Sequence, residues 1–488
     1  MKVAVIGAGW AGLSAAVRLV QRGHAVVVFE AARLPGGRAR AVRSKNVSEP
    51  IDNGQHILLG AYTETLSLMR SLGLDDAALF YRERLQLETL DGQFHLHAAN
   101  LPAPLHLLAG VLNGRGLAMR DRLALLRLVR SLQRAGWRVA ADLTVAQWLD
   151  RGKQSHGLVS VFWQPLCVAA LNTPIDDASA QLFAHVLRDS VGGAAAASDV
   201  LIPRVDLTEL WPAQVARYAA IKKPDALDIR YASPVRRLDS HDAHIDIDGE
   251  AFDAVVVAGN APSAQRLLHT LPVTEASAHY LSVLSAFRFL PIATLTLQLE
   301  RRWPVSRPML LLRDDPSRLH LGQWLFDRSA FMMPAPDTPD TPDTPDTHVT
   351  STQIASAAIP ERPGRAASIV NAGAGTPSAR PTLLNIVISD ARRLAQHDRE
   401  AVVKGVVEQI EEQGARFGPL PRVMAHELII EKRATFAAVR DLMRPANTTP
   451  WPRVWTAGDW TDTGYPGVLE GAVRSGLAAA DALTEALS

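Results

Sequence analysis

The first residues that could do chemistry are three glycines and one carboxylate near the N-terminus. Gly7, Gly9 and Gly12 form a G-x-G-x-x-G, and Glu30 follows at about the 20-residue spacing of a ribose acceptor. The first glycine would allow a tight turn, the second would let the backbone approach a pyrophosphate, and the third would let a helix pack closely on a strand. These residues predict a dinucleotide-binding turn, and a purely structural glycine turn is the alternative.

The segments around the glycines have the pattern needed to position them. Lys2–Ile6 is a short run rich in β-branched residues, typical of a strand buried on both faces. Leu13–Arg22 carries apolar residues at helical spacing and ends before Gly23, and His24–Phe29 has the composition of a second buried strand. This order would direct the first N–H groups of the helix, with their partial positive charge, at phosphates.

A second glycine pair lies beyond the first motif. Gly36 and Gly37 precede Arg38, whose guanidinium can neutralise phosphate. With this G-G-R, the sequence resembles the FAD-dependent amine oxidase and carotenoid desaturase superfamily. The resemblance implies that FAD is the cofactor and that Arg38 lies near its phosphates. It also implies that the D-x-G segment at Asp52–Gly54 runs close under the flavin, with its aspartate expected to cap the loop.

Two further segments carry the same resemblance. Val454–Thr456 is expected to be a strand, and Ala457–Trp460 after it is similar to the second FAD motif of the superfamily. The resemblance implies that Asp459 binds the ribityl chain or the pyrophosphate, with a helix N-cap as the alternative role. It also implies that a helix beginning at Gly467–Leu469 faces the flavin's pyrimidine oxygen, and that Val235 gives backbone hydrogen bonds to adenine. The residues expected to contact FAD are Gly7, Gly9, Trp10, Ala11, Gly12, Glu30, Gly36, Gly37, Arg38, Gly54, Gln55, His56, Val235, Gly458, Asp459, Gly467, Val468 and Leu469.

The expected fold class is α/β, with a Rossmann-like FAD-binding domain of the glutathione-reductase type and a substrate domain made of helices and a mixed sheet. The FAD-binding domain would be discontinuous and formed by residues 1–75, 203–272 and 425–488. The substrate domain would consist of a helical segment, 76–202, and a sheet-containing segment, 273–424.

Short patterns predict the strands of these domains. Asp248 and Gly249 predict a hairpin turn after a strand at His244–Ile247. Residues 334–381 contain a D-T-P repeat and are rich in Ala, Ser, Gly and Pro, so we expect a disordered insertion there. Strands that form the floor of a substrate cavity are expected at Ile292–Leu299, Leu319–Phe326 and Leu383–Ile388.

Composition narrows the partners and the compartment. Lys and Arg number 51 and Asp and Glu 50 in 488 residues, and this balance gives no reason to expect nucleic acid as a partner. Cys167 is the sole cysteine and lies in an apolar stretch, which favours a buried small side chain over a nucleophile, and no metal site is expected. Gly7 and Gly9 interrupt the N-terminal apolar run, which argues against a signal peptide and for a cytoplasmic protein.

The segment 101–138 combines apolar and basic residues. It holds seven arginines and one acid, Asp121. Leu125, Leu128 and Leu132 recur at helical spacing, with arginines on another face. The pattern fits a surface helix packed on the core. The alternative is a cationic amphipathic helix that lies on anionic lipid, which would make the protein peripheral on the inner face of the cytoplasmic membrane.

The C-terminal motif also bears on the substrate. Many amine oxidases of the superfamily hold the amine between two aromatic rings, one of them a tyrosine just before the final E-G-A. Here Val468 and Leu469 precede Glu470–Ala472, so the pocket roof is expected to be aliphatic. An aliphatic roof favours a lipophilic isoprenoid substrate over an amine.

Longer segments narrow the resemblance. Asp52–Tyr62, Glu431–Ala437 and Ala457–Gly476 are similar to the squalene-associated FAD-dependent desaturases, the bacterial hydroxysqualene dehydroxylases. The resemblance covers nearly the whole chain except the D-T-P insertion. It implies that hydroxysqualene loses its allylic hydroxyl and receives hydride from reduced FAD, which gives squalene for hopanoid synthesis. Hydroxide is a poor leaving group, so a general acid must protonate it, and the developing allylic cation needs a dry, apolar pocket.

His56, close to Gly54, is the first candidate for the general acid, and a hydrogen-bonded spacer is its alternative role. Lys432 and Arg433 could contact the flavin or a substrate oxygen, or could pair with Glu431. No second G-x-G-x-x-G is visible, so the electron donor would be a partner or a mobile carrier. The other activities that fit the sequence are an oxidative carotenoid-type desaturase, an amine oxidase and a non-catalytic lipid carrier that keeps FAD as a structural plug.

Overall fold

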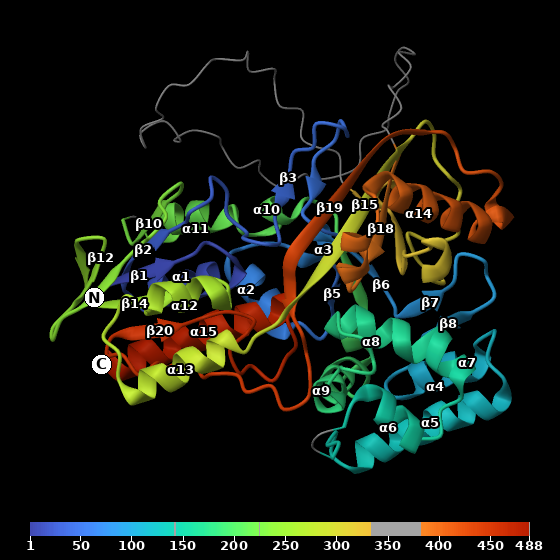
Figure 1. Ribbon diagram of the computed structural model, residues 1–488, viewed down its shortest axis with the longest axis horizontal. Helices are drawn as coiled ribbons and strands as arrows, with labels where there is room; N and C mark the ends of the chain where they lie inside the picture. The colour runs from blue at the N-terminus through green and yellow to red at the C-terminus, as the bar shows by residue number, and fades with distance from the viewer. Residues whose placement is uncertain (141–142, 224, 333–381, 488) are drawn as a thin grey trace, which may run out of the picture.

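The computed structural model describes residues 1–140, 143–223, 225–332 and 382–487. Two large sheets and a helical lobe make up the molecule, and both chain ends lie beside the first sheet, far from the helical lobe (Figure 1). The insertion predicted at 334–381 falls outside the described residues. Within the described ranges, no helix is both long enough and apolar enough to cross a membrane.

The first sheet is parallel and brings the two ends of the chain together. Its strands lie in the order β10 (Leu227–Arg230), β2 (Ala25–Phe29), β1 (Lys2–Ile6), β14 (Ala254–Val257) and β20 (Val454–Thr456). The strands predicted from the N-terminal and C-terminal motifs are confirmed. Open α/β sheets bind ligands at the carboxyl ends of their strands, where the loops after β1 and β20 lie.

Alternate residues of β1 face two different layers. Val5 packs with α1 (Trp10–Gln21) and α15 (Leu469–Leu487), whereas Ala4 belongs to the core on the opposite face. That opposite core includes a small antiparallel sheet within residues 238–252. Because side chains alternate along a strand, Val3, Ala4 and Val5 are all buried and only Lys2 at the start of β1 is exposed, which explains the apolar run.

The small sheet contains the predicted hairpin. β12 (Ile245–Ile247) and β13 (Glu250–Phe252) are joined by Asp248 and Gly249, whose φ angles are 48° and 91°. Positive φ at both central residues is the geometry that a two-residue hairpin turn of this type requires. The sequence prediction of a turn at this pair is confirmed.

The second large sheet is antiparallel throughout. Its strands lie in the order β16 (Met309–Leu311), β17 (Trp324–Asp327), β18 (Thr382–Ile388), β15 (Phe289–Leu299) and β19 (Val423–Phe436). Every neighbouring pair is antiparallel, so the predicted mixed sheet is wrong. The helix α14 (Arg399–Gln413) does connect two parallel strands, β18 and β19, but β15 lies between them and runs in the opposite direction.

The two faces of this sheet have different partners. Leu295 and Leu297 of β15 pack in one core with Val406 of α14, whereas Ile292 and Thr294 of the same strand line a cavity. The period-two alternation of β15 therefore separates a core face from a cavity face. The second sheet is one wall of the cavity.

Two predicted boundaries in this region differ from the structure. Leu319 has a φ of 58° and ends a short 3-10 turn, so the strand predicted at Leu319–Phe326 begins only at Trp324. β19 begins at Val423 and pairs along β15, so the domain boundary predicted at residue 425 lies inside a strand of the second sheet.

The segment predicted to be helical, 76–202, builds the helical lobe. Its longer helices are α4 (Leu105–Asn113), α5 (Met119–Arg134), α6 (Val145–Arg151), α8 (Gln164–Leu171) and α9 (Ala180–Val191). It also contains four strands that were not predicted, β6 (Phe80–Glu83), β7 (Gln86–Glu88), β8 (His95–His97) and β9 (Val200–Pro203). Strands this short are below the length at which periodicity is informative. Cys167 of α8 is fully buried and burial raises the pKa of its thiol, which agrees with the predicted structural role.

Candidate active site

One cavity of about 1320 Å³ lies between the two large sheets and extends into the helical lobe. This volume exceeds the roughly 300–1,000 Å³ of a typical single-ligand pocket. One end of the cavity, the polar end, is lined by glycines and charged groups, among them Gly9, Glu30 and Arg38. The far end is lined by apolar side chains, among them Leu107, Val111, Leu125, Val129, Leu166, Phe183, Val186 and Leu187. The cavity therefore suits two occupants of different polarity.

The N-terminus of α1 opens into the polar end. Gly9 is the N-cap and provides no side-chain cap, and the first helix N–H with a described acceptor is that of Leu13, which donates to Gly9 O at 2.9 Å. Trp10 and Ala11, the next residues of the turn, line the cavity with Gly9. Unpaired amides at the positive end of a helix form a binding site for an anion such as a pyrophosphate.

The second glycine pair packs directly on this turn. Gly36 N–H donates to Ala8 O at 2.8 Å, and a Cβ at Gly37 would lie only 3.0 Å from Gly9 Cα. Gly36 and Gly37 have φ angles of 106° and 63°, which residues with side chains rarely adopt. Beside them, Glu30 accepts hydrogen bonds from Ala8 N–H at 2.6 Å and from a second backbone N–H.

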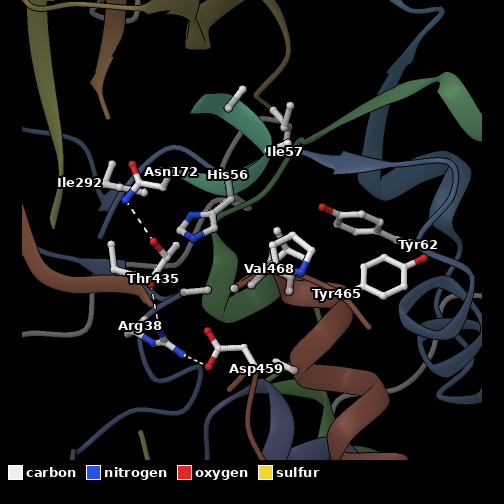
Figure 2. Close-up of a pocket in the computed structure, with 18 of the residues that line it drawn as sticks. Arg38, His56, Ile57, Tyr62, Asn172, Ile292, Thr435, Asp459, Tyr465 and Val468 are labelled. Atoms are coloured by element: carbon white, nitrogen blue, oxygen red, sulfur yellow. Dashed lines mark hydrogen bonds and ion pairs between the residues drawn. The ribbon is translucent and has the colours of Figure 1, made fainter. Parts of the chain in front are cut away.

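Arg38 and Asp459 join the N-terminal and C-terminal motifs. Arg38 Nη2 lies 2.7 Å from Asp459 Oδ1, and Nη1 donates to Ala434 O at 2.8 Å. Figure 2 shows this pair below His56 and Val468. Asp459 is nearly fully buried, and α15 begins only at Leu469, so the alternative role of helix N-cap does not apply.

The residues before α15 are fixed by close packing. A Cβ at Gly467 would lie 3.2 Å from Thr435 Cβ and 3.4 Å from Asp459 Oδ2. In the first turn of α15, Glu470 is fully buried and accepts hydrogen bonds from Thr65 N–H at 3.0 Å and Thr65 Oγ1 at 2.7 Å. It also pairs with Arg474 at 2.8 Å. These contacts hold the start of α15 where Gly467, Val468 and Leu469 line the cavity.

His56 lies between the polar and apolar ends. Its Nδ1 is 2.9 Å from Gly54 O, and a carbonyl can only accept, so Nδ1 carries the proton. Burial lowers the pKa of His56, an effect that the hydrogen bond to Gly54 only partly offsets and that the nearby Arg38 reinforces. The imidazole is therefore neutral near pH 7 and presents Nε2 as an acceptor, which is the wrong state for a general acid.

Two tyrosines share the roof with Val468. Figure 2 shows the Tyr62 hydroxyl pointing into the pocket and the Tyr465 hydroxyl pointing away from it. Tyr465 donates to Asp189, whereas the Tyr62 hydroxyl has no hydrogen-bond partner in the part of the chain that the structure describes. Burial, and to a lesser extent Glu470, raises the pKa of Tyr62. The expectation of an aliphatic roof is therefore incomplete, because Tyr62 adds a protonated phenol to it.

Asn172 and Thr435 are cavity residues that the sequence did not identify. Asn172 ends α8 with a φ of 46°, and its Nδ2 donates to Thr435 Oγ1 at 3.1 Å (Figure 2). Its Oδ1 accepts from Asp390 N–H at 2.9 Å. An asparagine after a helical stretch predicts a left-handed helix end. Nothing in the sequence indicates that this end meets β19 at the cavity.

The residues predicted to contact FAD converge on one cavity. All of them line it except Gly12, and their contacts with FAD stay predictions. A Cβ at Gly12 would lie 1.9 Å from Gly7 O, so Gly12 acts by allowing α1 to pack close to the preceding turn. Val235, predicted beside adenine, lines the polar end with Pro234 and Arg236.

The remaining candidates have structural partners. Asp52 accepts from Leu207 N–H at 2.9 Å, and burial raises its pKa to about 6 although Arg328 opposes the shift. Glu431 accepts from Asn53 Nδ2 at 3.1 Å, and neither Lys432 nor Arg433 forms an ion pair with it within the described ranges. The contact of Asp52 is with the first residue of α10 (Leu207–Leu210) and not with its own loop, so the loop-capping role stays a prediction.

The residues at the polar end fit FAD. The free amides of α1 can take the pyrophosphate, and the closely packed glycines leave backbone in place of side chains along the cavity. Glu30 lines the same cavity as Val235, which is predicted to lie beside adenine. The part of the cavity that the helical lobe lines is mostly apolar. A cofactor at the polar end would thus face a lipophilic compartment.

The sequence pattern of flavin-containing amine oxidoreductases matches residues 10–484. The chain is 26% identical over 497 residues to a hydroxysqualene dehydroxylase of Rhodopseudomonas palustris, over 98% of this chain and 97% of the relative. It is 28% identical over 507 residues to a hydroxysqualene dehydroxylase of Sinorhizobium fredii, over 99% and 98%. A solved oxidoreductase from Methanosarcina mazei shares the fold, with a TM-score of 0.68 at 16% identity over 99% of this chain and 100% of that one. FAD is the cofactor, and this chain belongs to the flavin-containing amine oxidoreductase family.

Proposed function

We propose that the protein removes the allylic hydroxyl of hydroxysqualene reductively and so forms squalene for hopanoid synthesis. The observation that carries the proposal is the continuous apolar compartment beyond His56, lined by leucine, valine and phenylalanine and joined to the polar end. Two full-length relatives with the corresponding name support the same reaction. A C30 substrate would partition into lipid, so we place the reaction on the inner face of the cytoplasmic membrane.

The reaction has a simple balance. The allylic C–O bond breaks, the hydroxyl leaves as water after it takes up a proton, and a C–H bond forms at the same carbon. Reduced FAD supplies the hydride. Each turnover therefore consumes two electrons and two protons from outside the substrate, and the electrons come from an external donor, a partner or a mobile carrier. A hydride acceptor carbon must lie within about 3–3.5 Å of its donor, which requires a tightly held substrate.

The apolar walls protect the developing carbocation. Phe162, Trp163 and Phe183 line the far end, and Trp163 is packed edge-to-face against both phenylalanine rings. Rigid aromatic walls exclude water, so hydride and not water captures the cation. Phe162 and Trp163 are carried by a π-helical turn at Val159–Trp163, a local distortion that is common where side chains are aimed at a site.

The proton that leaves with the hydroxyl needs a donor at the roof. We assign the donor role to Tyr62, whose hydroxyl points into the pocket and keeps its proton because burial raises its pKa. Neutral His56 would accept a hydrogen bond from the substrate hydroxyl through Nε2 and so orient it. In this proposal Tyr62, and not His56 as the sequence led us to expect, is the general acid.

A pH profile and two variants test this assignment. We expect Tyr62→Phe to lower kcat by about a hundredfold with the flavin spectrum unchanged, in line with the size of general acid catalysis. We expect wild-type kcat/KM to be flat from pH 7 to 8, because the lowered pKa of His56 leaves its imidazole neutral there. A fall of kcat/KM with rising pH that is absent in His56→Gln would instead make His56 the acid.

Product analysis tests the function itself. The purified holoenzyme is incubated without oxygen with hydroxysqualene and dithionite-reduced FAD, and squalene is measured by mass spectrometry. We expect squalene in stoichiometric amounts with flavin oxidation. Dehydrogenation of a polyene by oxidised FAD would show a carotenoid-type desaturase, peroxide release with simple amines would show an amine oxidase, and no flavin turnover with any isoprenoid would support a lipid carrier.

A further inference from the structure

The helical lobe carries a concentrated patch of exposed apolar side chains. Thirteen large apolar side chains in the described residues are strongly exposed, and six of them lie between residues 101 and 123. They are Leu101, Leu105, Leu108, Leu112, Met119 and Leu123. Three of them, spaced i, i+3 and i+7, form one face of α4. Apolar residues gathered in this way mark an interaction surface, whereas single exposed residues do not. We call these six residues the α4–α5 face.

Unpaired positive charge surrounds the α4–α5 face. Of the seven arginines between 101 and 138, only Arg120 has a carboxylate within ion-pair distance in the described part of the chain, Asp121 at 3.8 Å. Arg122 instead donates to the backbone carbonyls of Leu117 and Gly114. The other arginines, including Arg127, are exposed and uncompensated. The surface is therefore complementary to a layer of negative charge above an apolar interior.

The same two helices line the cavity with their inner faces. Val111 of α4 and Leu126 and Val129 of α5 are cavity residues. Leu108 is both a lining residue and 37% exposed, so the apolar surface and the cavity meet at this side chain. Figure 1 shows α4 and α5 at the corner of the molecule far from both chain ends. Leu108 therefore gives an apolar molecule a point of contact with both the outer surface and the cavity.

We propose that the α4–α5 face docks on an anionic lipid bilayer and that the lipophilic substrate enters the cavity from the bilayer beside Leu108. The leucines insert among the acyl chains, and the arginines bind the phosphate headgroups while their methylene stems stay in the interface. Each arginine near an anionic surface adds to the attraction, and salt weakens this part. The entry route rests on the proposed function, but the docking does not.

Vesicle sedimentation with the oxidised, substrate-free holoenzyme tests the docking. We expect the protein to bind vesicles that contain phosphatidylglycerol more strongly than pure phosphatidylcholine vesicles, and to lose part of this preference in 0.5 M salt. Leu105→Ser/Leu112→Ser should lower the partition coefficient at least about tenfold, because two exposed leucines are removed without touching the cavity lining. Arg127→Glu/Arg134→Glu should remove the preference for anionic vesicles.

Two controls make the result decisive. Val273→Ser/Met424→Ser removes two exposed apolar side chains elsewhere and should sediment like the wild type. Every docking variant should keep its flavin spectrum and its turnover of detergent-dispersed substrate, and should lose turnover only with substrate in vesicles. Failure of the wild type to bind either vesicle, or unchanged binding of Leu105→Ser/Leu112→Ser, would overturn the proposal. So would a dimer that this variant dissociates, because the face would then be covered by a second copy.

Discussion

Arg38 and Asp459 are separated by 421 residues in the sequence, yet their side chains meet at the polar end of the cavity. Arg38→Ala would leave the nearly buried carboxylate of Asp459 without its partner. We expect a loss of about 2 kcal/mol in the free energy of unfolding and at least about a tenfold weaker FAD affinity. Denaturant unfolding and flavin titration measure the two effects.

The matched control for this pair is Arg70→Ala. Arg70 pairs with Asp76 on the surface, so its loss should change the free energy of unfolding by less than about 1 kcal/mol and leave the flavin affinity unchanged. Equal flavin affinity in Arg38→Ala and the wild type would show that the pair does not support the cofactor site.

Asp52 makes a second prediction at the residue scale. Its pKa is raised by burial to about 6 in the fold, from about 3.9 in an unfolded chain. Between pH 4 and 6 the unfolded state therefore releases a proton that the folded state keeps, and stability falls as the pH rises through this window. We expect this contribution to be on the order of 1–3 kcal/mol and to be absent in Asp52→Asn. Thermal unfolding of both proteins from pH 4.5 to 7.5 measures the difference, and parallel curves would refute it.

Elements α1 and α15 meet at backbone distance. A Cβ at Gly476 would lie 2.1 Å from both Ala11 O and Ser14 Oγ, so no larger residue fits between the helices. We expect Gly476→Val to lower the free energy of unfolding by about 3 kcal/mol through overpacking. Gly157→Ala in α7 (His156–Leu158) is the control, because the nearest atom to its new Cβ is 4.0 Å away. Similar melting temperatures for the two variants would contradict the packing argument.

The sequence predicted features that lie within one local unit of strands and helices, but not features that form where distant elements meet. Gly7, Gly9 and Glu30 are positioned by one strand–helix–strand unit, so local patterns predicted them. The direction of β15 relative to its neighbours depends on chain segments far away in sequence, and the sheet was predicted as mixed although it is antiparallel. Tyr62 and Asn172 belong to the cavity only because separate elements meet there, and local patterns carry no signal for that meeting. The protonation of His56 depends on burial, which likewise follows from tertiary packing.

At the scale of the whole molecule, the cavity is built from both chain ends and from the helical lobe between them. A ligand that binds only the folded state raises stability by mass action. With free FAD at 100 times its Kd, we expect about 2.7 kcal/mol of added stability and a higher melting temperature than for the apoprotein. Differential scanning calorimetry over a series of FAD concentrations measures it, and a melting temperature independent of FAD would contradict the shared site.

The position of β20 at the edge of the first sheet has a consequence for biosynthesis. A ribosome releases β1, α1 and β2 long before β20, Asp459 and α15, since Asp459 follows Arg38 by 421 residues. The nascent polypeptide therefore cannot complete the polar end of the cavity until these later residues have emerged, and tight flavin binding must wait for them. Until then the small side chains of α1 that pack on α15 stay uncovered.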